Sequence, residues 1–517
     1  MRALDAVALA ALCVAMLLAG LRWLRVAQRE HYLAGAASRF AARWWRSSPL
    51  NLAAVSLAAA GAGLVFVWGP ASLGEAVLLA VGPFGLGLKG RTSRLAWTRR
   101  LATVACAAGG IAAIAVGAGA TGGGLGGSLR AAAVVALLVP LVLDAALFVT
   151  RPLEGVLAGR FVRRAVSRLE RVRPVVVAVT GSYGKTTTKG YIAHFTSSRL
   201  ATVASPASYN NRAGLARTVN EHLMEGTEVL VAEMGSYGPG EIAEMCSWMS
   251  PRISVITAIG PAHLERFRSL GRTLAAKAEI AASAEVVVLN VDDERLARLA
   301  ERLAASGKKV VGASGRSDAA GVAVVPAEEG IELCLAGRRC GVVALEASDR
   351  PTALSNVACA AAVALELEVP AEEVLTRIPT LPVPPNRLQR YAADGGYVVL
   401  DDTFNSNPAG AKLALGRLRQ EAPLGRRVVV TPGMVELGPT QFEENASFAE
   451  AAALVASDIV VVARTNRRAL VEGARRSSTA AQLHTAEHLD QAVEWVRSHL
   501  AAGDAVLYEN DLPDHYP

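Results

Sequence analysis

Aromatic residues, paired cysteines and long basic stripes are all scarce in this sequence. Aromatics make up only 5% of the 517 residues, and no stretch interleaves them with basic residues, which argues against a nucleic-acid partner. The six cysteines form no CxxC pair. Cys334 and Cys340 are near enough in sequence to pair, but the soluble part is typical of a reducing cytosol with free thiols.

Long apolar runs are confined to the first 150 residues, although the hydrophobic content of the whole chain is 52%. At about 1.5 Å per residue, runs of this length cross most of a bilayer core. The five candidate crossings are Leu4–Leu21, Leu50–Trp68, Ala71–Leu88, Leu101–Ala120 and Ala131–Thr150. The third is the weakest, because it is short, carries Glu75 and is broken by Pro83. A signal peptide is the alternative for the first run, but further apolar runs follow it and no A-x-A cleavage site precedes a secreted domain.

Basic residues are nearly absent from two of the loops, "GPASLGE" and "TGGGLGGSLR". They cluster instead in 22–46, 89–100 and 151–173, which follow the first, third and fifth runs. Five crossings put every basic segment on one side, as the positive-inside rule requires. We therefore expect a multi-pass protein of the cytoplasmic membrane, with its amino terminus outside and everything after Arg151 in the cytoplasm. The net charge of +7 also fits contact with membrane lipid.

Two features near the expected membrane allow alternative interpretations. Asp144 lies inside the fifth run, where an acidic residue is either functional or reaches the interface from a helix end. The stretch "FVRRAVSRLERVR" (Phe161–Arg173) is either a basic amphipathic helix on anionic lipid or a solvated linker. Both interpretations of this stretch place the next domain against the membrane.

A glycine turn followed by Lys-Thr-Thr-Thr lies within "VVVAVTGSYGKTTTKG" (Val175–Gly190). The apolar run before it suits a buried parallel strand, and a helix should begin near Thr186. Such a loop aims backbone N–H groups at phosphate oxygens, with Lys185 reaching the phosphates and the Thr186 hydroxyl reaching Mg²⁺. Val179 occupies the first glycine position of the usual pattern, so the strict motif fails. A chance Gly-Lys-Thr is the alternative, which the strand–loop–helix context disfavours.

Further strands are expected at 227–235, 252–260 and 284–293, with helical stretches between them. This alternation predicts an α/β fold with a doubly wound, mostly parallel sheet, in which ligands bind at the carboxyl ends of strands. Three polar residues fall at or just past such ends: Glu233, His263 and Asn290. Each alone is an ordinary solvated loop residue, but around one phosphate loop they indicate a metal–nucleotide site. A second α/β unit follows the proline-rich linker "PTLPVPPNR".

Nine short pieces of the sequence, in their order, resemble the Mur ligase family, and within it the enzymes that add D-alanyl-D-alanine to UDP-muramoyl-tripeptide. They are "TGSYGKTTTK", "YNNRAG", "VAEMGSYGPGEI", "GPAHLERF", "AAKAEI", "NVDD", "NRLQRY", "DDTFNSNP" and "GMVELG". With the apolar region, this predicts a transmembrane domain of about five helices, a basic juxtamembrane helix, a middle ATP-binding domain and a smaller Rossmann-like C-terminal domain. The expected bounds are 1–150, 151–173, 174–383 and 384–517.

The resemblance implies an ATP-dependent, ADP-forming amide ligase and gives roles to the residues that match the family's motifs. The catalytic residues are Lys185, His263, Lys277 and Arg387. The ATP-binding loop comprises Thr180, Gly181, Ser182, Tyr183, Gly184, Lys185, Thr186 and Thr187. Further nucleotide contacts are Asn290 beside adenine, Arg387 on the γ-phosphate, Asp402 on ribose, and Asn405 and Asn407 in the same loop. The ligands of two Mg²⁺ ions are Thr186, Glu233, His263 and Lys277. Lys277 matches a lysine that family members carbamylate, and an ordinary surface lysine is the alternative.

The sequence also departs from the family's pattern. The uridine-nucleotide-binding domain expected before the phosphate loop is replaced by membrane, Thr352-Ala353 replaces an adenine-side His-Asn pair, and "YENDLPDHYP" replaces a Lys-Gly-Ser-Arg region. We therefore expect a membrane-anchored ligase that joins an amino acid or dipeptide amine to the carboxylate of an envelope precursor, with a lipid-linked acceptor fitting the anchor. The alternatives are a non-catalytic nucleotide-binding scaffold, a polyglutamate-type capsule ligase and an ATP-driven transporter.

Overall fold

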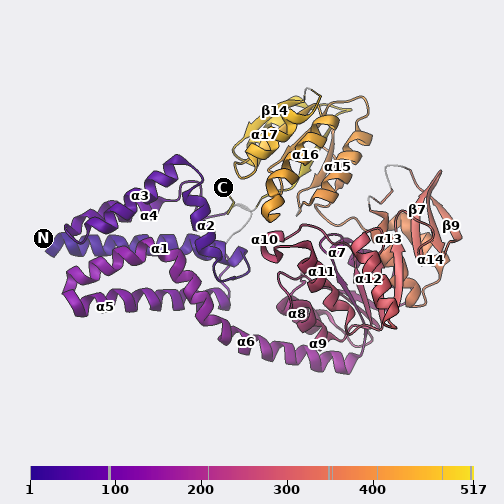
Figure 1. The fold of residues 1–517 in the computed structure, drawn as a ribbon, viewed down its shortest axis with the longest axis horizontal. Coiled ribbons are helices and arrows are strands. Elements are labelled where there is room, and N and C mark those ends of the chain that lie inside the picture. Colours follow the sequence, from indigo (N-terminus) through magenta and orange to yellow (C-terminus); the bar gives the residue numbers. More distant parts are fainter. Residues whose placement is uncertain are drawn as a thin grey trace. The chain divides into compact units, whose positions relative to one another are not determined.

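The computed structural model of the chain contains two compact units. The helical unit comprises Met1–Leu157 together with Leu512–Pro517, and the α/β unit comprises Ala158–Asp511 (Figure 1). The structure describes residues 2–90, 95–207, 209–346, 350–351, 353–404, 406–479, 481–512 and 515–516. The chain therefore returns to the helical unit at its end, so the C-terminal domain expected at 384–517 stops at Asp511.

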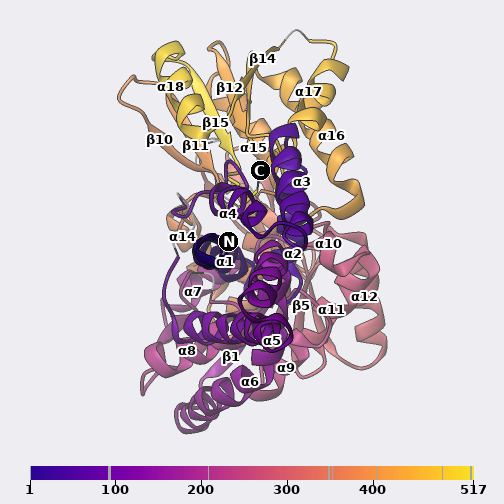
Figure 2. The same ribbon diagram turned by 90° about the vertical axis from the view of Figure 1, so that its left-hand side faces the viewer.

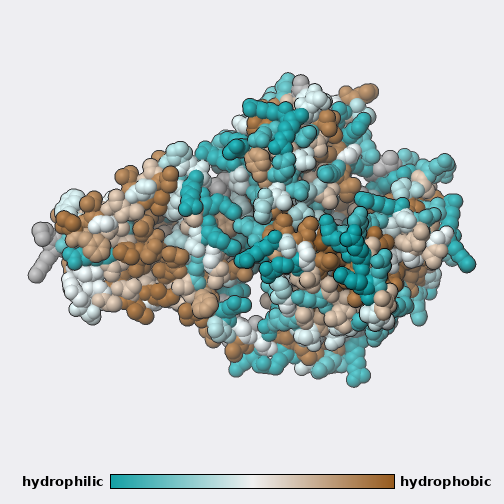
Figure 3. All heavy atoms as spheres, in the orientation of Figure 1, coloured by the Kyte–Doolittle hydropathy of each residue, from teal (hydrophilic) through white to brown (hydrophobic). Residues whose placement is uncertain are grey.

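The helical unit consists of helices rich in alanine, glycine and leucine. Their bounds are α1 (Arg2–Arg29), α2 (Ala36–Trp45), α3 (Pro49–Leu64), α4 (Ser72–Val81), α5 (Arg99–Leu137) and the first part of α6 (Val139–Val172). Small side chains such as Ala8, Ala58 and Ala132 are fully buried where α1, α3 and α5 meet, which lets the helices approach closely. Figure 3 shows apolar side chains gathered on the outside of this unit.

The expectation of five membrane-crossing helices is confirmed only in part by the described residues. Two helical segments are long and apolar enough to cross a membrane, Ala3–Arg29 and Arg99–Leu137, and the pair α2 and α3, bent by 113°, makes a third if it counts as one span. The run expected at Ala71–Leu88 forms a helix only over Ser72–Val81, about 15 Å long. It ends at Gly82-Pro83, because proline donates no helical hydrogen bond.

Helix α5 reverses direction inside the loop "TGGGLGG". Gly123 and Gly124 have non-helical backbone angles, and Gly124 has a φ of 54°. A Cβ atom on Gly127 would lie 2.0 Å from the carbonyl oxygen of Gly119, although these residues would be about 12 Å apart in a continuous helix. The 39 residues of α5 are therefore two antiparallel arms, and the loop expected between the last two apolar runs is where the chain turns.

Helix α4 runs alongside α1 in the same direction. Gly69, in the turn before α4, lies against Asp5 near the start of α1. At the other end, the Arg22 guanidinium donates hydrogen bonds to the carbonyl oxygens of Leu79 and Ala80. Because the last four carbonyls of a helix lack partners within it, Arg22 caps α4 and joins the two helix ends.

Asp144 caps another helix of the same unit. Its carboxylate accepts hydrogen bonds from the backbone N–H groups of Ala37, at 3.2 Å, and Ser38, at 2.9 Å, in the first turn of α2. A carboxylate at a helix amino terminus is stabilised by the unpaired N–H groups and by the helix dipole. The contacts give Asp144 a structural role as a helix cap, which neither interpretation named.

The middle domain of the α/β unit is built on a nine-stranded sheet with the order β2-β3-β1-β4-β5-β6-β7-β8-β9. The strands are β1 (Val175–Thr180), β2 (Thr202–Ala204), β3 (Val229–Glu233), β4 (Ile253–Ile256), β5 (Val286–Asn290), β6 (Lys309–Ser314), β7 (Val322–Ala327), β8 (Gly330–Leu335) and β9 (Arg338–Ala344). From β2 to β7 neighbouring strands are parallel, as predicted. The chain moves to opposite sides of β1 at β3 and β4, so the loop after β1 lies at a topological switch point. The antiparallel strands β8 and β9 were not predicted.

Helices cover both faces of this sheet. Their bounds are α7 (Lys185–Thr196), α8 (Arg212–His222), α9 (Glu241–Met249), α10 (Leu264–Phe267), α11 (Leu270–Ala278), α12 (Glu294–Ala305), α13 (Leu354–Glu366) and α14 (Ala371–Arg377). Helices α7 and α13 bury their apolar side chains on one face, and α8, α9 and α12 on the other. The alternating side chains of β1 serve both cores, with Val177 in the first and Ala178 in the second.

The basic stretch Phe161–Arg173 continues helix α6 into this second core. Its apolar residues Val162, Ala165 and Leu169 are buried against the domain, and Arg168 donates a 2.6 Å hydrogen bond to the carbonyl oxygen of Leu223. Neither expected interpretation describes it, because the apolar face packs on protein rather than on lipid or in solvent.

The C-terminal domain is a six-stranded sheet with the order β10-β11-β15-β12-β13-β14. The strands are β10 (Gln389–Ala392), β11 (Val398–Asp402), β12 (Arg427–Thr431), β13 (Asp458–Val462), β14 (Gln482–Ala486) and β15 (Ala505–Glu509). The helices are α15 (Pro408–Glu421), α16 (Gln441–Val455), α17 (Arg467–Arg476) and α18 (Leu489–His499). All neighbouring strands are parallel except β10 and β11. Figure 2 shows α18 on one side of the sheet and α16 and α17 on the other.

Candidate nucleotide and metal site

The phosphate loop lies between β1 and α7, as predicted. Strand β1 includes Val179, which is fully buried and paired with Glu233 on β3. The position of the missing first glycine therefore belongs to the strand, and the loop itself begins only at Gly181. Helix α7 begins at Lys185, so its unpaired N–H groups lie where such a loop binds phosphate.

Two loop positions accept only glycine. Gly181 has a φ of 154° and Gly184 a φ of 77°, and both values are strained for residues that carry a Cβ atom. A Cβ on Gly181 would lie 2.0 Å from the Thr257 hydroxyl, and one on Gly184 would lie 2.5 Å from the Asn356 side-chain oxygen. The backbone is therefore held in an open, side-chain-free turn, which fits the oxygens of a nucleotide phosphate.

Three of the expected loop residues hold the loop in place. Thr180 is buried and donates a 2.7 Å hydrogen bond to the carbonyl oxygen of Met234. The Ser182 hydroxyl exchanges hydrogen bonds with the backbone of Gly260, and the Tyr183 ring packs on the same glycine. Thr187 is half-buried on α7. Of the predicted set, this leaves Lys185 and Thr186 as the side chains placed for phosphate and metal.

Lys185 is folded back over its own loop. Its ammonium donates hydrogen bonds to the carbonyl oxygens of Gly181, at 2.9 Å, and Ser182, at 3.5 Å. Burial lowers the pKa of this ammonium, the neighbouring Arg387 lowers it further, and the Glu233 carboxylate acts in the opposite direction. A bound phosphate would offer Lys185 a stronger, charged acceptor than these carbonyls.

Glu233 is the centre of the polar cluster beside the loop and is only 2% exposed. One carboxylate oxygen accepts a 3.0 Å hydrogen bond from the Thr186 hydroxyl, and the other a 3.1 Å bond from the Asn210 amide. The Lys189 ammonium lies 3.3 Å from the carboxylate. Burial alone would raise the pKa of Glu233, but Lys185 and Lys189 and these hydrogen bonds hold it below its usual value. The carboxylate is therefore ionised at neutral pH.

The pair Thr186 and Glu233 fits a magnesium ion. A hydroxyl and a carboxylate are hard oxygen donors of the kind Mg²⁺ prefers, and Mg²⁺ commonly binds through one or two carboxylates plus substrate phosphates. Within the ranges that the structure describes, no group of three or more His, Cys, Asp or Glu side chains could hold a metal by itself. The arrangement therefore suits a metal that needs nucleotide oxygens to complete its shell.

Asn210 and Lys189 are site residues without an assigned role in the sequence analysis. Lys189 also donates a 2.8 Å hydrogen bond to the carbonyl oxygen of Ala207, so it joins α7 to the loop before "YNNRAG". Both lie within pieces that carried the family resemblance. Their contacts to Glu233 depend on how α7, β3 and this loop come together, which sequence spacing alone does not give.

His263 contacts the C-terminal domain. It precedes α10 with a φ of 56°, and its imidazole is hydrogen-bonded to the Glu436 carboxylate. Arg266 lies 3.6 Å from the same carboxylate, and the Tyr237 ring meets the imidazole edge-on at 4.9 Å. The predicted metal ligand is therefore placed at the junction of the two domains, with Glu436 as a partner that the sequence analysis did not name.

Lys277 is buried, so an ordinary surface lysine does not describe it. Its side chain lies on α11, is only 3% exposed, and its ammonium is 6.0 Å from the centre of the Phe267 ring. Burial lowers the pKa of Lys277 to about 7, the charge of Lys185 lowers it further, and Glu241 acts in the opposite direction. A large fraction of this amine is neutral at physiological pH, which is the form that reacts with carbon dioxide.

Arg387 brings the C-terminal domain to the phosphate loop. Its guanidinium donates a 3.4 Å hydrogen bond to the Thr186 hydroxyl and lies 4.8 Å over the Phe404 ring. Burial lowers the pKa of Arg387, whereas Glu233 and Asp402 raise it. The Arg387 guanidinium therefore lies beside the loop residue Thr186, and its contact with the γ-phosphate stays a prediction.

Asp402 ends β11, and its neighbour Glu509 ends β15 in the adjacent position. Burial raises the pKa of Asp402 to about 6, although the Leu388 N–H and Arg387 oppose the shift. Burial and the charge of Asp402 raise the pKa of Glu509 well above its usual value, against the hydrogen bond from Ser406. Glu509 was not among the predicted residues, because nothing in the sequence pairs the ends of β11 and β15.

Two of the asparagine side chains predicted to contact the nucleotide are hydrogen-bonded within the protein. The Asn290 amide donates a 2.8 Å bond to the Thr257 carbonyl, and its oxygen accepts from the N–H of Asp292. Asn407 caps α15 by accepting a 2.9 Å bond from Gly410. Asn405 and the adenine-side Thr352 lie outside the described residues.

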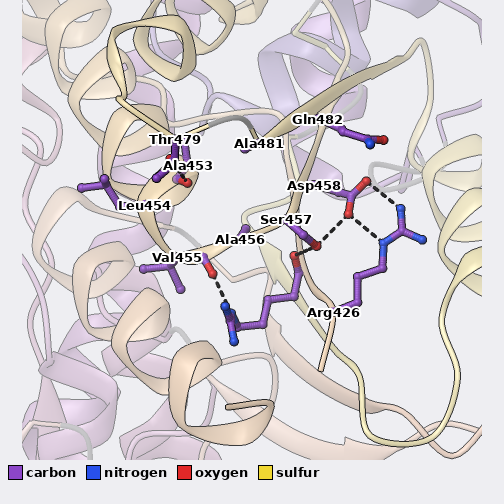
Figure 4. A pocket seen from close by; sticks show the side chains of 11 residues that line it. Arg426, Ala453, Leu454, Val455, Ala456, Ser457, Asp458, Thr479, Ala481 and Gln482 are labelled. Carbon is purple, nitrogen blue, oxygen red and sulfur yellow. Dashed lines mark hydrogen bonds and ion pairs between the residues drawn. The ribbon is translucent and has the colours of Figure 1, made fainter. Parts of the chain in front are cut away.

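A cavity of about 520 Å³ lies at the opposite edge of the C-terminal sheet, where β12, β13 and β14 begin. Figure 4 shows the Arg426 guanidinium turned to Asp458, with two 2.8 Å hydrogen bonds. The neighbouring Arg427 is held by the carbonyl oxygens of Val455 and Ala422. Both arginine side chains are therefore hydrogen-bonded within the domain. The cavity lies at the amino ends of the strands, so it is separate from the nucleotide site.

Comparison with known proteins identifies the family. The "Mur ligase middle domain" matches residues 179–364, and the "Mur ligase, glutamate ligase domain" matches residues 386–508. A UDP-N-acetylmuramoyl-tripeptide–D-alanyl-D-alanine ligase of Mycobacterium bovis is 31% identical over 362 residues, which are 64% of this chain and 69% of the relative. The chain belongs to the Mur ligase family. Mur ligases use ATP and Mg²⁺, and this protein is an ATP-dependent, ADP-forming ligase of carbon–nitrogen bonds.

Solved Mur ligase structures share the fold of the α/β unit. A crystal structure of MurF from Acinetobacter baumannii gives a TM-score of 0.59 at 24% identity and covers 68% of this chain and 77% of its own. MurF from Thermotoga maritima in complex with ADP gives 0.58 at 22% identity, with coverages of 68% and 80%. At these identities the likeness concerns the fold.

Proposed function

We propose that this Mur ligase is a membrane-anchored enzyme that joins the amine of an amino acid or dipeptide to a carboxylate of a peptidoglycan or other cell-envelope precursor. The observation that carries the proposal is the convergence on one loop of Thr186, the ionised Glu233 and Arg387 from the C-terminal domain. The related mycobacterial protein is named as a ligase of UDP-N-acetylmuramoyl-tripeptide and D-alanyl-D-alanine, which supports a peptide-forming reaction on a wall precursor.

The proposed reaction has two balanced steps. The acceptor carboxylate attacks the γ-phosphorus of ATP, the bond to the β-phosphate oxygen breaks, and an acyl phosphate and ADP result. The amine then attacks the acyl carbon, the bond to the phosphate oxygen breaks, and the amide, inorganic phosphate and one proton are released. Catalysis of such phosphoryl transfer is mostly positioning and neutralisation of charge.

The residues of this chain supply that positioning. Lys185 and the N–H groups at the start of α7 hold the phosphates, and Arg387 neutralises the γ-phosphate oxygens. Thr186 and Glu233 would hold one Mg²⁺ ion, which supplies Lewis-acid polarisation of the phosphates when bound. His263 and a carbamylated Lys277 would hold a second. Asp402 and Asn407 border the ribose, with Asn405 in the same loop and Asn290 on the adenine side.

The helical unit, in this proposal, contributes five segments to the cytoplasmic membrane. They are α1, α3, α4 with the turn before it, and the two arms of α5, the second continuing into α6. The contacts of Asp5 with Gly69 and of Arg22 with the end of α4 support a parallel arrangement of α1 and α4, as a first and a third crossing require. The basic segments 22–46, 89–100 and 151–173 then lie in the cytoplasm with the ligase domains, and the amino terminus lies outside.

The acceptor, we infer, is presented at the membrane. The Mur ligase match begins at residue 179, and apolar helices stand where the family has its uridine-nucleotide domain. An acceptor on a lipid carrier would lie in the same plane as the helical unit, so anchoring raises its effective concentration at the site.

Two experiments test this proposal. Mass spectrometry of envelope precursors should detect an amidated precursor in cells with the protein and its unligated form in cells without it. An unchanged precursor pool argues instead for a non-catalytic nucleotide-binding scaffold.

For the topology, a tag on Met1 should be reached from outside the cell, and one inserted at Leu424, which is fully exposed, only from inside. The reverse pattern refutes the proposed orientation.

A further inference from the structure

His515 and Tyr516 form a small buried cluster with the helical unit. His515 is 2% exposed and Tyr516 is 9% exposed. They pack against Glu30, which directly follows α1, and against Phe40, Arg43 and Trp44 of α2. We call these four side chains the tail groove.

Two hydrogen bonds fix the position of His515 in the tail groove. Its imidazole Nε2 lies 2.9 Å from the Glu30 carboxylate, and its carbonyl oxygen accepts a 2.7 Å bond from the Trp44 indole N–H. The Glu30 side chain is itself only 8% exposed. Burying such polar groups is costly unless they are paired, so these bonds favour one defined seating of the tail over a loose apolar contact.

Aromatic and cationic side chains complete the groove. The Phe40 ring meets the His515 imidazole at 4.7 Å and the Tyr516 ring at 5.1 Å, both edge to face. The Arg43 guanidinium lies 5.0 Å from the Phe40 ring and 5.3 Å from the Tyr516 ring. Edge-to-face and cation–π contacts add to the stability that burial gives, so Tyr516 contributes to the same seating as His515.

The residues just before the tail are anchored in the ligase. The Asn510 amide donates a 2.7 Å hydrogen bond to the Gly433 carbonyl oxygen, and its N–H donates to the carbonyl of Asp402. Five positions separate Asn510 from His515, and a chain of that length extends to no more than about 17 Å. The tail therefore follows within a few residues on a segment that is held by the C-terminal sheet.

We propose that the tail that carries His515 and Tyr516 is a docking peptide that fastens the C-terminal ligase domain to the helical unit and makes that unit part of the working enzyme. Helix α6 connects the helical unit to the first residues of the α/β unit. Docking of the tail adds a second attachment after the last residues of the α/β unit, which limits how far the C-terminal domain opens between turnovers. The docking stands on the contacts above, whereas its effect on ligation rests on the proposed function.

The docking is tested by acylation of histidines with diethyl pyrocarbonate in the full-length protein in nanodiscs, read residue by residue by mass spectrometry. His488 is exposed and serves as the internal standard. We expect His515 to react at least about tenfold more slowly than His488, because reaction requires local opening of the tail. Burial lowers the pKa of His515, so its ring is neutral and slow acylation reports burial rather than protonation.

Matched tryptophan variants test the groove itself. Trp44→Phe removes the N–H that holds the His515 carbonyl and should bring the reactivity of His515 close to that of His488. Trp45→Phe makes the same change at the next residue, whose indole has no bond to the tail among the described contacts, and should leave His515 protected. Equal reactivity of His515 and His488 in the wild-type protein overturns the docking, whatever the enzyme catalyses.

The consequence for ligation needs a separate measurement. A chain ending at Asp511 should keep its affinity for ATP and lose several-fold in turnover with a membrane-presented acceptor. Full turnover by this truncated chain, together with a protected His515 in the wild type, refutes the working role of the tail and leaves only a structural one. Absence of turnover in the wild-type protein would contradict the proposed function and not the docking.

Discussion

Glu436 of the C-terminal domain is hydrogen-bonded to the imidazole of His263 in the middle domain. The two residues are joined by neighbouring contacts as well, because the Glu265 N–H donates a 3.2 Å bond to the Glu436 carbonyl oxygen and Arg266 lies 3.6 Å from its carboxylate. Glu436 therefore binds the start of α10 through several contacts, one of them with His263, to which the family resemblance gives the role of a metal ligand. These contacts join the middle domain to the C-terminal domain.

Replacing Glu436 with alanine should impair closure of the ligase domains. We expect kcat to fall about tenfold, because a misplaced C-terminal domain leaves the site incompletely assembled, while ATP affinity stays within about twofold. Steady-state ADP release and calorimetric ATP titration measure the two quantities. Glu443→Ala is the matched control, since Glu443 pairs with Arg476 on the exposed side of the same domain. A Glu436→Ala protein with the kcat of the wild type would refute the role of the Glu436 contacts in domain closure.

Lys277 should be essential through its carbamate. Lys277→Ala should lose most activity, and a short-chain carboxylate such as propionate should restore part of it by replacing the missing anionic ligand. Lys412→Ala, an exposed lysine on α15, is the control. Full activity of Lys277→Ala would contradict the carbamate role.

The same residue predicts a pH dependence. Because the pKa of Lys277 is lowered to about 7, its amine is neutral above that pH and protonated below it. Carbamate forms from the neutral amine, so activity should fall as the pH drops below about 7 and should fall further in buffers stripped of carbon dioxide. Activity that is insensitive to added bicarbonate at pH 6.5 would count against this assignment.

Asp144 should matter for stability and not for ligation. Asp144→Ala removes the cap of α2 and should destabilise the protein by about 1 kcal/mol, which lowers the thermal midpoint in detergent. The kcat should not change. Glu170→Ala, an exposed carboxylate on the same helix α6, should change neither quantity. A large loss of kcat without a loss of stability would indicate instead that Asp144 has a functional role.

The elements that sequence predicts well are those with strong local signals. The apolar run at Val175–Val179 and the glycine turn after it give the strand and the phosphate loop, because burial and backbone freedom act within a few residues. The turn at Gly123–Gly124 likewise falls in the predicted loop. The missing glycine at Val179 was not a defect, since that residue belongs to the strand.

The parts that sequence does not predict depend on contacts between distant segments. Lys189 and Asn210 reach Glu233 from other elements, and Glu509 meets Asp402 only because β15 inserts beside β11. The docked tail is the extreme case, because 485 positions separate His515 from Glu30. The shortness of α4 is a local feature that the sequence does indicate, because Pro83 lies inside the third apolar run and the helix ends at Val81.

We propose that the phosphate loop drives amide formation on a membrane-presented carboxylate. The most direct test is ADP release by the full-length protein in nanodiscs that carry lipid-linked envelope precursor, with and without an amino acid or dipeptide, beside Lys185→Ala. We predict ADP release that requires both acceptor and amine, matches the amide formed, and is lost in Lys185→Ala. ATP binding without acceptor-dependent ADP release, across lipid-linked and soluble UDP-muramoyl-peptide acceptors, would contradict the claim.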